Sequence, residues 1–379
     1  MKLFSVFCFI TLIVAFAGLT NAQVPGLTLP PSGNNQHSIV TQYIGPVQIS
    51  IDYNSPRVHF NGQDRRGKIW GDLVPYGLVN LGFGTCTECP WRGGANENTV
   101  FRTSNDILVQ GKPLKAGAYG LHFIPGKDEW TIIFSNNSTA WGSFTYDPKE
   151  DALRVQGKPE KSEYNEWLTY EFTERDTDHG TVALKWEELQ LPIQIKVENI
   201  EDVYVAHLEQ ELRNNPGFIP DNWAAAAQYT VQTKKHMDLG LKWAEMAVNS
   251  PSYGKENFTT LSTLADLQEA NGKTEDAAKT REKALNHGSA TAIDIHQYAR
   301  GLLAQGKVDE ALRVFQLNVK RFPNVWPTEW GLARGYSAKK NFAEAIKHAK
   351  LAIPQAPNEG SKKNVTDGIK KLEQNQDIN

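Results

Sequence analysis

Alanine and proline recur at a fixed interval in the C-terminal half of the sequence. The positions that keep an interval of 34 residues are Ala265, Ala299 and Ala333, then Ala277, Ala311 and Ala345, and finally Pro323 and Pro357. Gly272-Lys273 and Gly306-Lys307 fall at equivalent points between them, and Lys340-Asn341 takes that place in the third unit. Self-similarity at this period indicates paired helices that can bury their apolar faces only by stacking. We therefore predict a superhelix of helix hairpins from about residue 222 to the C-terminus.

One unit of this series resembles the tetratricopeptide repeat closely. Its matching residues are Tyr298, Ala299, Leu302, Gly306, Ala311, Leu312, Phe315 and Pro323. Three units keep the period over residues 258–357, while an earlier unit at 223–251 is followed by an insertion at 252–257. Residues 361–374 are expected to form a helix that caps the array. The resemblance implies a concave surface, lined by the first helix of each unit, that binds a protein or peptide.

The N-terminal half has the period of β-strands. Apolar and polar residues alternate in Gln48-Ile49-Ser50-Ile51-Asp52-Tyr53, as in a strand with one buried face. Similar short runs recur up to residue 199, separated by turns and without a long amphipathic helix. We predict an α+β multidomain protein. A flexible lead-in (23–35) precedes an antiparallel, jelly-roll-like β-sandwich (36–199), which is followed by the all-α repeat domain (200–379).

The N-terminus has the layout of a secretory signal. Lys2 provides a positive charge, residues 3–19 form an apolar run, and Thr20-Asn21-Ala22 offers a small-residue exit. We expect a signal peptide at residues 1–22 and a periplasmic or secreted location, with an uncleaved membrane anchor as the alternative. No other stretch reaches spanning length. The 40 basic and 43 acidic residues nearly balance, which argues against a general affinity for nucleic acid.

Unusual residues are dense between positions 53 and 125. The strings are Tyr53-Asn54-Ser55-Pro56-Arg57-Val58, Arg66-Gly67-Lys68-Ile69-Trp70-Gly71, Leu73-Val74-Pro75-Tyr76-Gly77, Trp91-Arg92-Gly93-Gly94-Ala95-Asn96-Glu97, Ala116-Gly117-Ala118-Tyr119 and Ile124-Pro125. Together they resemble the bacterial family catalogued as domain of unknown function 2911, over roughly residues 36–199. The resemblance implies an exported protein of a kind often joined to tetratricopeptide repeats, and it implies no known activity. Residues 78–90 interrupt the family pattern, so a shared site cannot depend on Cys86 and Cys89.

The polar residues inside these strings are candidates for a ligand site. Arginine presents a planar fork that suits a carboxylate or phosphate, and Asn and Glu can complete a polar pocket. The candidates are Arg57, Trp91, Arg92, Asn96 and Glu97. The alternative is a buried structural network in which Arg92 pairs with Glu97 and Asn96 caps a turn. The residues alone leave both interpretations open.

Cys86-Thr87-Glu88-Cys89 has the spacing of a redox pair or of half a zinc site. The neighbouring sequence lacks two further zinc ligands at matching spacing, and Pro90 favours a loop over the helix start of a redox motif. We predict a disulfide between Cys86 and Cys89, formed in an oxidising compartment, with metal and redox roles as alternatives. The sequence predicts no metal site, no cofactor and no catalytic residue, because Gly-x-Ser-x-Gly, His-Glu-x-x-His and phosphate-loop strings are missing.

Two further surfaces follow from the pattern. Polar residues on the first helix of each repeat are candidates for the partner-binding face, although a solvated helix face looks the same. These candidates are Asp266, Gln297, Arg300, Glu329 and Arg334. The aromatic residues of the sandwich are compatible with a carbohydrate platform, which would appear as a row of exposed tryptophans. Core packing is the commoner use of such residues.

These observations favour an exported, non-enzymatic binding or scaffold protein. Its repeats are expected to engage a protein or peptide partner, and its β domain to bind an unidentified glycan or anionic ligand. One rival is an extracytoplasmic hydrolase of envelope polymers or glycans, with its chemistry near Arg92, Asn96 and Glu97. The other is a carbohydrate-binding module. An open pocket with unpaired carboxylates at residues 91–97 favours the enzyme, and mutual burial of Arg92 and Glu97 counts against it.

Overall fold

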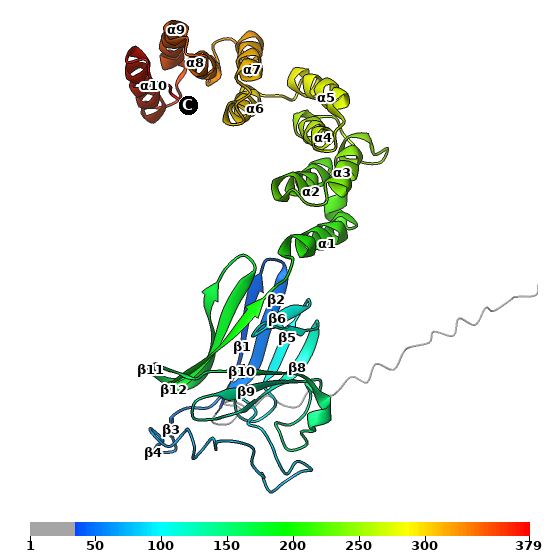
Figure 1. The fold of residues 1–379 in the computed structure, drawn as a ribbon, viewed down its shortest axis with the longest axis vertical. Helices are drawn as coiled ribbons and strands as arrows, with labels where there is room; N and C mark the ends of the chain where they lie inside the picture. Colours follow the sequence, from blue (N-terminus) through cyan, green and yellow to red (C-terminus); the bar gives the residue numbers. More distant parts are fainter. Residues whose placement is uncertain (1–34) are drawn as a thin grey trace, which may run out of the picture. The chain divides into compact units, whose positions relative to one another are not determined.

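The computed structural model describes residues 35–379, which form two compact units that divide between Glu198 and Asn199 (Figure 1). The predicted signal segment and the predicted lead-in up to residue 34 lie outside the described residues. The first unit consists of antiparallel sheets and the second of helices, which confirms the predicted fold class. Each unit is described by itself.

The β unit is a sandwich of two antiparallel sheets. The larger sheet has the order β1 (Gln36–Ile44), β2 (Val47–Ser55), β5 (Val100–Thr103), β8 (Gly117–Ile124), β9 (Trp130–Ser135), β10 (Asp151–Gly157). The smaller sheet has the order β11 (Glu160–Arg175), β12 (His179–Lys196), β6 (Ile107–Val109), β7 (Lys112–Leu114). A separate hairpin is formed by β3 (His59–Phe60) and β4 (Gln63–Asp64).

The alternation along β2 separates a core face from an outer face. Its apolar side chains point inward, and the ring of Tyr53 meets Tyr170 of the smaller sheet with 4.9 Å between centroids. The fully buried residues of this strand are Val47, Ile49 and Ile51. Burial of each such side chain contributes about 1.5–3 kcal/mol. Asp52 and Asn54, which flank Tyr53 along the strand, lie on the outer face of the larger sheet.

A long segment, residues 65–99, joins β4 to β5 with neither a regular strand nor a helix. It nevertheless contributes to the core, because Trp70 packs with its ring centroid 5.1 Å from Trp130 and 5.8 Å from Trp186. Trp91 lies 5.8 Å from Trp70 in the same cluster. Trp130 and Trp186 are 0% and 1% exposed, so these aromatics form a core and not a surface platform.

Residues 35–379 therefore lack the row of exposed tryptophans that the carbohydrate-platform alternative requires. Trp141 is 58% exposed, and the other tryptophans of this part of the chain are buried or half-buried.

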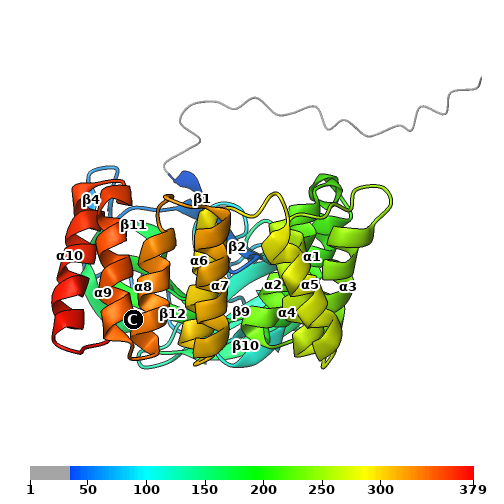
Figure 2. The same ribbon diagram turned by 90° about the horizontal axis from the view of Figure 1, so that it is seen from above.

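The helical unit contains ten α-helices within the described residues (Figures 1 and 2). They are α1 (Ile200–Leu212), α2 (Pro220–Thr233), α3 (Met237–Asn249), α4 (Phe258–Ala270), α5 (Thr274–Asn286), α6 (Ala292–Ala304), α7 (Val308–Arg321), α8 (Thr328–Ala338), α9 (Phe342–Ala352) and α10 (Glu359–Glu373). The hairpins α4–α5, α6–α7 and α8–α9 coincide with the three predicted repeats. The α2–α3 hairpin is the irregular unit, and α10 is the predicted final helix.

Small residues and left-handed turns explain the period of these hairpins. The alanines at equivalent positions of the first helices are fully buried where helices cross; they are Ala265, Ala299 and Ala333. At the turn inside each hairpin the backbone is left-handed, with φ +78 at Gly272, +76 at Gly306 and +59 at Lys340. Lys340 thus adopts a left-handed conformation that is favourable for glycine and unfavourable for a residue with a side chain.

Candidate functional site

The segment that contains the family-like string is attached to both sheets of the β unit. Trp91 and Phe123 of β8 exchange two backbone hydrogen bonds of 2.7 Å. The hydroxyl of Tyr170, on the smaller sheet, donates to the carbonyl oxygen of Gly93 at 2.8 Å. Gly93 is left-handed, with φ +65, which lets the chain pass closely over these two rings. The side chains that follow Trp91 are therefore held in defined positions.

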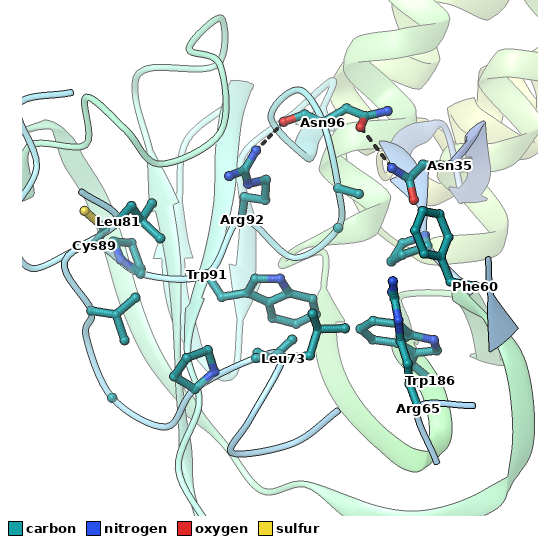
Figure 3. A pocket seen from close by; sticks show the side chains of 18 residues that line it. Asn35, Phe60, Arg65, Leu73, Leu81, Cys89, Trp91, Arg92, Asn96 and Trp186 are labelled. Atoms are coloured by element: carbon teal, nitrogen blue, oxygen red, sulfur yellow. Dashed lines mark hydrogen bonds between the residues drawn. The ribbon is translucent and has the colours of Figure 1, made fainter. Parts of the chain in front are cut away.

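This segment forms one wall of a cavity of about 450 Å³ (Figure 3). The walls are largely apolar and aromatic, and include Phe60, Leu73, Leu81, Trp91 and Trp186. The polar side chains at the cavity are Asn35, Arg65, Arg92 and Asn96. The volume lies in the range of small-molecule sites, about 300–1,000 Å³. No Asp, Glu or His side chain of the described residues lines it.

Arg92 and Arg65 have no carboxylate partner. Arg92 donates from Nη1 to the carbonyl oxygen of Asn96 at 2.5 Å, and its guanidinium lies 5.0 Å from the Phe144 ring centroid. Burial lowers the pKa of Arg92. The Arg65 guanidinium lies 4.3 Å from the ring centroid of Phe60. Neither arginine forms a salt bridge within residues 35–379, and residues 1–34 contain no Asp or Glu.

The structure brings three of the five predicted ligand residues together and places the other two elsewhere. Trp91, Arg92 and Asn96 line the cavity together. The considered pairing of Arg92 with Glu97 is wrong, because Glu97 is exposed and its Oε2 accepts from Asn54 Nδ2 at 2.8 Å. Arg57 lies apart from the cavity, with its guanidinium 5.6 Å from the Trp167 ring centroid.

Sequence reasoning missed Arg65 and Trp186. Arg65 precedes Arg66, which forms an exposed salt bridge of 2.5 Å with Asp64, and nothing in the string distinguishes the two arginines. Trp186 is a core residue of β12, as the preference of strand aromatics for the core predicts, and the strand packing also places it in the wall of the cavity. Only the closure of the sandwich brings positions so far apart in the chain together.

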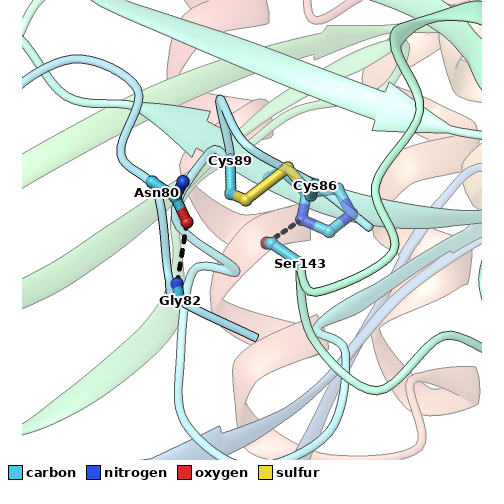
Figure 4. The surroundings of a disulfide bond; sticks show 6 residues. Asn80, Gly82, Cys86, Cys89 and Ser143 are labelled. Carbon is cyan, nitrogen blue, oxygen red and sulfur yellow. Dashed lines mark hydrogen bonds between the residues drawn. A yellow bond between two sulfur atoms is a disulfide. The ribbon is translucent and has the colours of Figure 1, made fainter. Parts of the chain in front are cut away.

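The predicted disulfide is present beside the cavity (Figure 4). It joins Cys86 and Cys89 with a Cα–Cα distance of 5.6 Å, and Cys89 is fully buried. Backbone hydrogen bonds of 2.8 and 3.1 Å between Val79 and Cys89 close the inserted loop. Near it, the buried pair His122 Nδ1 and Ser143 Oγ is 3.0 Å apart. Burial lowers the pKa of His122 to about 4, with a further contribution from the charge of Arg92.

On the helical unit, the predicted partner-binding residues have different surroundings. Gln297 and Arg300 are exposed. Asp266 forms a salt bridge of 3.0 Å with Arg281, and burial raises the pKa of Asp266. Glu329 is 8% exposed and lies 2.7 Å from His348 Nδ1, so it is enclosed between helices.

Arg334, the fifth predicted residue, is covered by the end of the described chain. Its Nη1 donates to the carbonyl oxygen of Ile378 at 2.8 Å. Ser337, one turn later on α8, donates to Asp377 Oδ1 at 2.6 Å and accepts from the backbone N–H of Ile378 at 3.1 Å. Burial lowers the pKa of Arg334 to about 10, and the nearby charge of Arg300 acts in the same direction. A segment without helix or strand thus lies along α8.

No cluster of three or more His, Cys, Asp or Glu side chains within residues 35–379 has the arrangement of a metal site. No helix of this part of the chain is long and apolar enough to cross a membrane.

Comparison with solved structures gives similarities to proteins with tetratricopeptide repeats. YrrB, described as a TPR protein with an unusual peptide-binding site, is 18% identical with a TM-score of 0.28, over 45% of this chain and 84% of that one. The C-terminal part of a TPR repeat-containing protein from Cytophaga hutchinsonii is 15% identical with a TM-score of 0.33, over 46% and 66%. TPR-like repeats of a kinesin light chain from Podosopora anserina are 19% identical with a TM-score of 0.29, over 41% and 87%.

TM-scores this low carry no argument, so the repeat assignment rests on the 34-residue period and the observed hairpins. No match was found among curated proteins. The model of one family, described as a protein of unknown function (DUF2911), matches residues 35–195, which coincide with the two sheets and the cavity. Over residues 35–195, the β unit of this chain is therefore similar to the DUF2911 family.

Proposed function

We propose that the protein is a two-site binding protein, whose β unit takes up an organic anion and whose helical repeats hold an extended segment of a partner protein. The observation that carries this proposal is the lining of the cavity at Trp91. Two arginines, Arg65 and Arg92, stand there without carboxylate partners among aromatic walls. A ligand with an anionic group and a flat apolar body complements both features.

The energetics favour an anion at this position. A guanidinium has five N–H donors, and Arg92 uses one of them on the carbonyl of Asn96. A hydrogen bond between such a charged group and a carboxylate contributes about 1.5–3 kcal/mol. Burial makes the charge of Arg92 less favourable, so a bound anion regains part of that loss. The apolar body of the ligand packs against Trp91 and Leu73.

The residues that line the cavity at Trp91 favour a binding function over a hydrolytic one. General acid–base catalysis needs a titratable side chain within hydrogen-bond reach of the substrate. The described lining residues offer arginine and amide groups but no carboxylate, imidazole or hydroxyl side chain, and Cys89 is engaged in the disulfide. Glu97, which the hydrolase hypothesis placed at this centre, faces a different groove.

Calorimetric titration of the full chain with 1-naphthoate tests the anion site, with the uncharged 1-naphthamide as the matched probe. We expect naphthoate to bind about tenfold more tightly or better, the equivalent of one charge-assisted hydrogen bond. Arg65→Gln and Arg92→Gln should each remove most of this preference. Arg66→Gln is the control, because Arg66 is exposed and paired with Asp64. Equal affinity for the two probes, or an equal loss in the Arg66 variant, refutes the proposal.

The contacts of residues 377–379 support the second site. Arg334 and Ser337 bind a backbone carbonyl, a backbone N–H and a carboxylate of this segment, which are groups that any extended acidic peptide offers. A labelled peptide of residues 374–379 should bind a chain that ends at residue 375 and should bind the full chain at least about tenfold more weakly. An Asp377→Ala peptide serves as control. Failure of the peptide to bind the shortened chain overturns this part alone.

We also propose that the protein acts outside the cytoplasm, as its N-terminal pattern predicts. The disulfide beside the cavity supports this location, because such bonds persist in oxidising compartments. Mass spectrometry of the protein recovered from cell fractions tests the proposal. A cytoplasmic protein that still contains residues 1–22 contradicts it.

A further inference from the structure

The outer face of the larger sheet carries a second, polar groove. Its floor comes from neighbouring strands: His37 on β1 is in register with Asn54 on β2, and Asp52 on β2 is in register with Val100 on β5. The opposite wall is the segment 138–141, which follows β9. The groove has a volume of about 820 Å³. It is therefore large enough for more than one sugar-sized ring.

Buried amides form part of the floor. Asn54 and Asn98 are 6% and 5% exposed, and both line the groove. Asn98 Nδ2 donates to the carbonyl oxygen of Asn137 at 3.1 Å, while its Oδ1 has no hydrogen-bond partner within residues 35–379. Gly120 packs closely against this amide, since a Cβ at Gly120 would lie 2.9 Å from Asn98 Nδ2. Asn98 thus presents a buried acceptor that lacks a donor.

The positive charges at the groove already have partners. His37 Nε2 lies 2.6 Å from Asp52 Oδ1, and Arg102 Nη1 lies 3.5 Å from Asp52 Oδ2. The carboxylate of Glu97 is held by a neutral amide, since its Oε2 accepts from Asn54 Nδ2 at 2.8 Å. An anionic ligand therefore finds no unpaired positive charge among the described residues of the groove. Hydroxyl groups, in contrast, can donate to the free oxygens of these carboxylates and amides.

Trp141 provides an apolar surface at the rim. Its side chain is 58% exposed and lines the same groove as the buried amides. A pyranose ring has an apolar face made of C–H groups and an edge of hydroxyls. It can therefore lie on the indole while its hydroxyls reach the polar floor. A few convergent polar groups beside an aromatic wall are the usual lining of a specific site.

We propose that this outer groove binds a neutral saccharide, which stacks on Trp141 and donates hydroxyls to the polar floor formed by Asn54, Glu97 and Asn98. Among the described residues, Asn96 alone lines both this groove and the cavity at Trp91. The two sites differ in chemistry, because the cavity has two unpaired arginines and the groove has amides and carboxylates. The saccharide proposal therefore does not depend on the anion proposal.

The test is titration of the full chain with neutral trisaccharides, followed by calorimetry and by tryptophan fluorescence. The probes are cellotriose, maltotriose, xylotriose and chitotriose, each up to about 10 mM, which detects dissociation constants in the millimolar range. We expect at least one to bind and to change the fluorescence. Trp141→Ala should weaken it about tenfold or more, and Asn98→Ala should do the same if it folds.

Two controls keep the result interpretable. Tyr43, on β1, is 57% exposed and lies outside the groove, so Tyr43→Ala matches Trp141→Ala in exposure and should leave binding unchanged. Arg92→Gln should also leave it unchanged, because Arg92 lines only the cavity. The proposal is overturned if none of the four probes binds, if Trp141→Ala binds as well as the unaltered chain, or if Arg92→Gln abolishes binding.

Discussion

Gly93 holds the wall of the cavity in place, and its replacement gives a sharp test of that role. A Cβ at Gly93 would lie 2.5 Å from Phe123 Cε2 and 2.7 Å from Tyr170 Oη. Gly77, in the same segment, is also left-handed, with φ +80 against +65, but has nothing within 4 Å of a Cβ. Gly93→Ala and Gly77→Ala therefore share the backbone strain and differ in packing.

The magnitudes follow from these contacts. A left-handed backbone costs an alanine about 1–2 kcal/mol, and the stiffer unfolded chain offsets about 0.4–1 kcal/mol, so Gly77→Ala should destabilise by roughly 1 kcal/mol. Gly93→Ala adds overpacking of about 1–3 kcal/mol, because Phe123 and Tyr170 are 0% and 3% exposed and cannot move aside. It also displaces the Tyr170 hydroxyl from the Gly93 carbonyl, which costs about 1–3 kcal/mol. We expect a total of about 3–7 kcal/mol.

Native-state hydrogen exchange read by mass spectrometry on β8 measures this loss. The method reports the opening free energy of the β unit separately from that of the helical unit. A loss in Gly93→Ala that equals the loss in Gly77→Ala would refute the reasoning. It would show that the segment yields to the added methyl group, so that Phe123 and Tyr170 do not determine the position of the cavity wall.

Three further predictions concern stability. Lys340→Gly should stabilise the helical unit by about 0.5–1 kcal/mol because φ is +59 at this residue. Lys339→Gly, at a residue where φ is −79, should destabilise the unit. Urea unfolding followed by circular dichroism compares the two variants, and equal effects contradict the argument. Burial lowers the pKa of His122 from 6.5 to about 4. Between these pH values His122 is therefore protonated in the unfolded chain but not in the folded unit. The free energy of unfolding of the β unit should therefore fall by up to about 3 kcal/mol as the pH falls from 6.5 to 4. His122→Gln should reduce this pH dependence, measured by hydrogen exchange on β8, and an unchanged pH dependence contradicts the argument. Reduction of Cys86–Cys89 should destabilise the β unit by about 2 kcal/mol or less, because the closed loop is short, and a Cys86→Ser, Cys89→Ser variant should not respond to reductant in thermal unfolding.

The repeats could be predicted because their constraint is local and repeated. A buried alanine recurs wherever two helices cross, and a left-handed residue recurs wherever a hairpin turns, so the period is visible without knowledge of the tertiary contacts. The partner-binding face was harder to predict. Glu329 and Arg300 both fall on first helices, but Glu329 is enclosed against His348 whereas Arg300 is exposed. A helical period does not show which neighbour covers a given polar residue.

The cavity could be predicted only in part. Trp91, Arg92 and Asn96 belong to one short string, so they remain together in any fold that keeps the segment ordered. Arg65 and Trp186 join them because the segment after β4 and the strand β12 meet in the closed sandwich. The outer groove is a similar case, since its floor comes from β1, β2 and the start of β5, and no motif marks it.

The two periodicities, and with them a β-sandwich followed by stacked hairpins, can be predicted from the residue pattern, because alternation and helical repetition arise from local backbone geometry. The short spacing of Cys86 and Cys89 likewise predicts that they can form a disulfide. Which polar groups have partners depends, in contrast, on the tertiary contacts. Arg92 is left without the carboxylate of Glu97, and Asn98 is buried without a donor, because sheet register and loop packing bring together groups that are distant in the chain. Those uncompensated groups are where the proposed ligands bind.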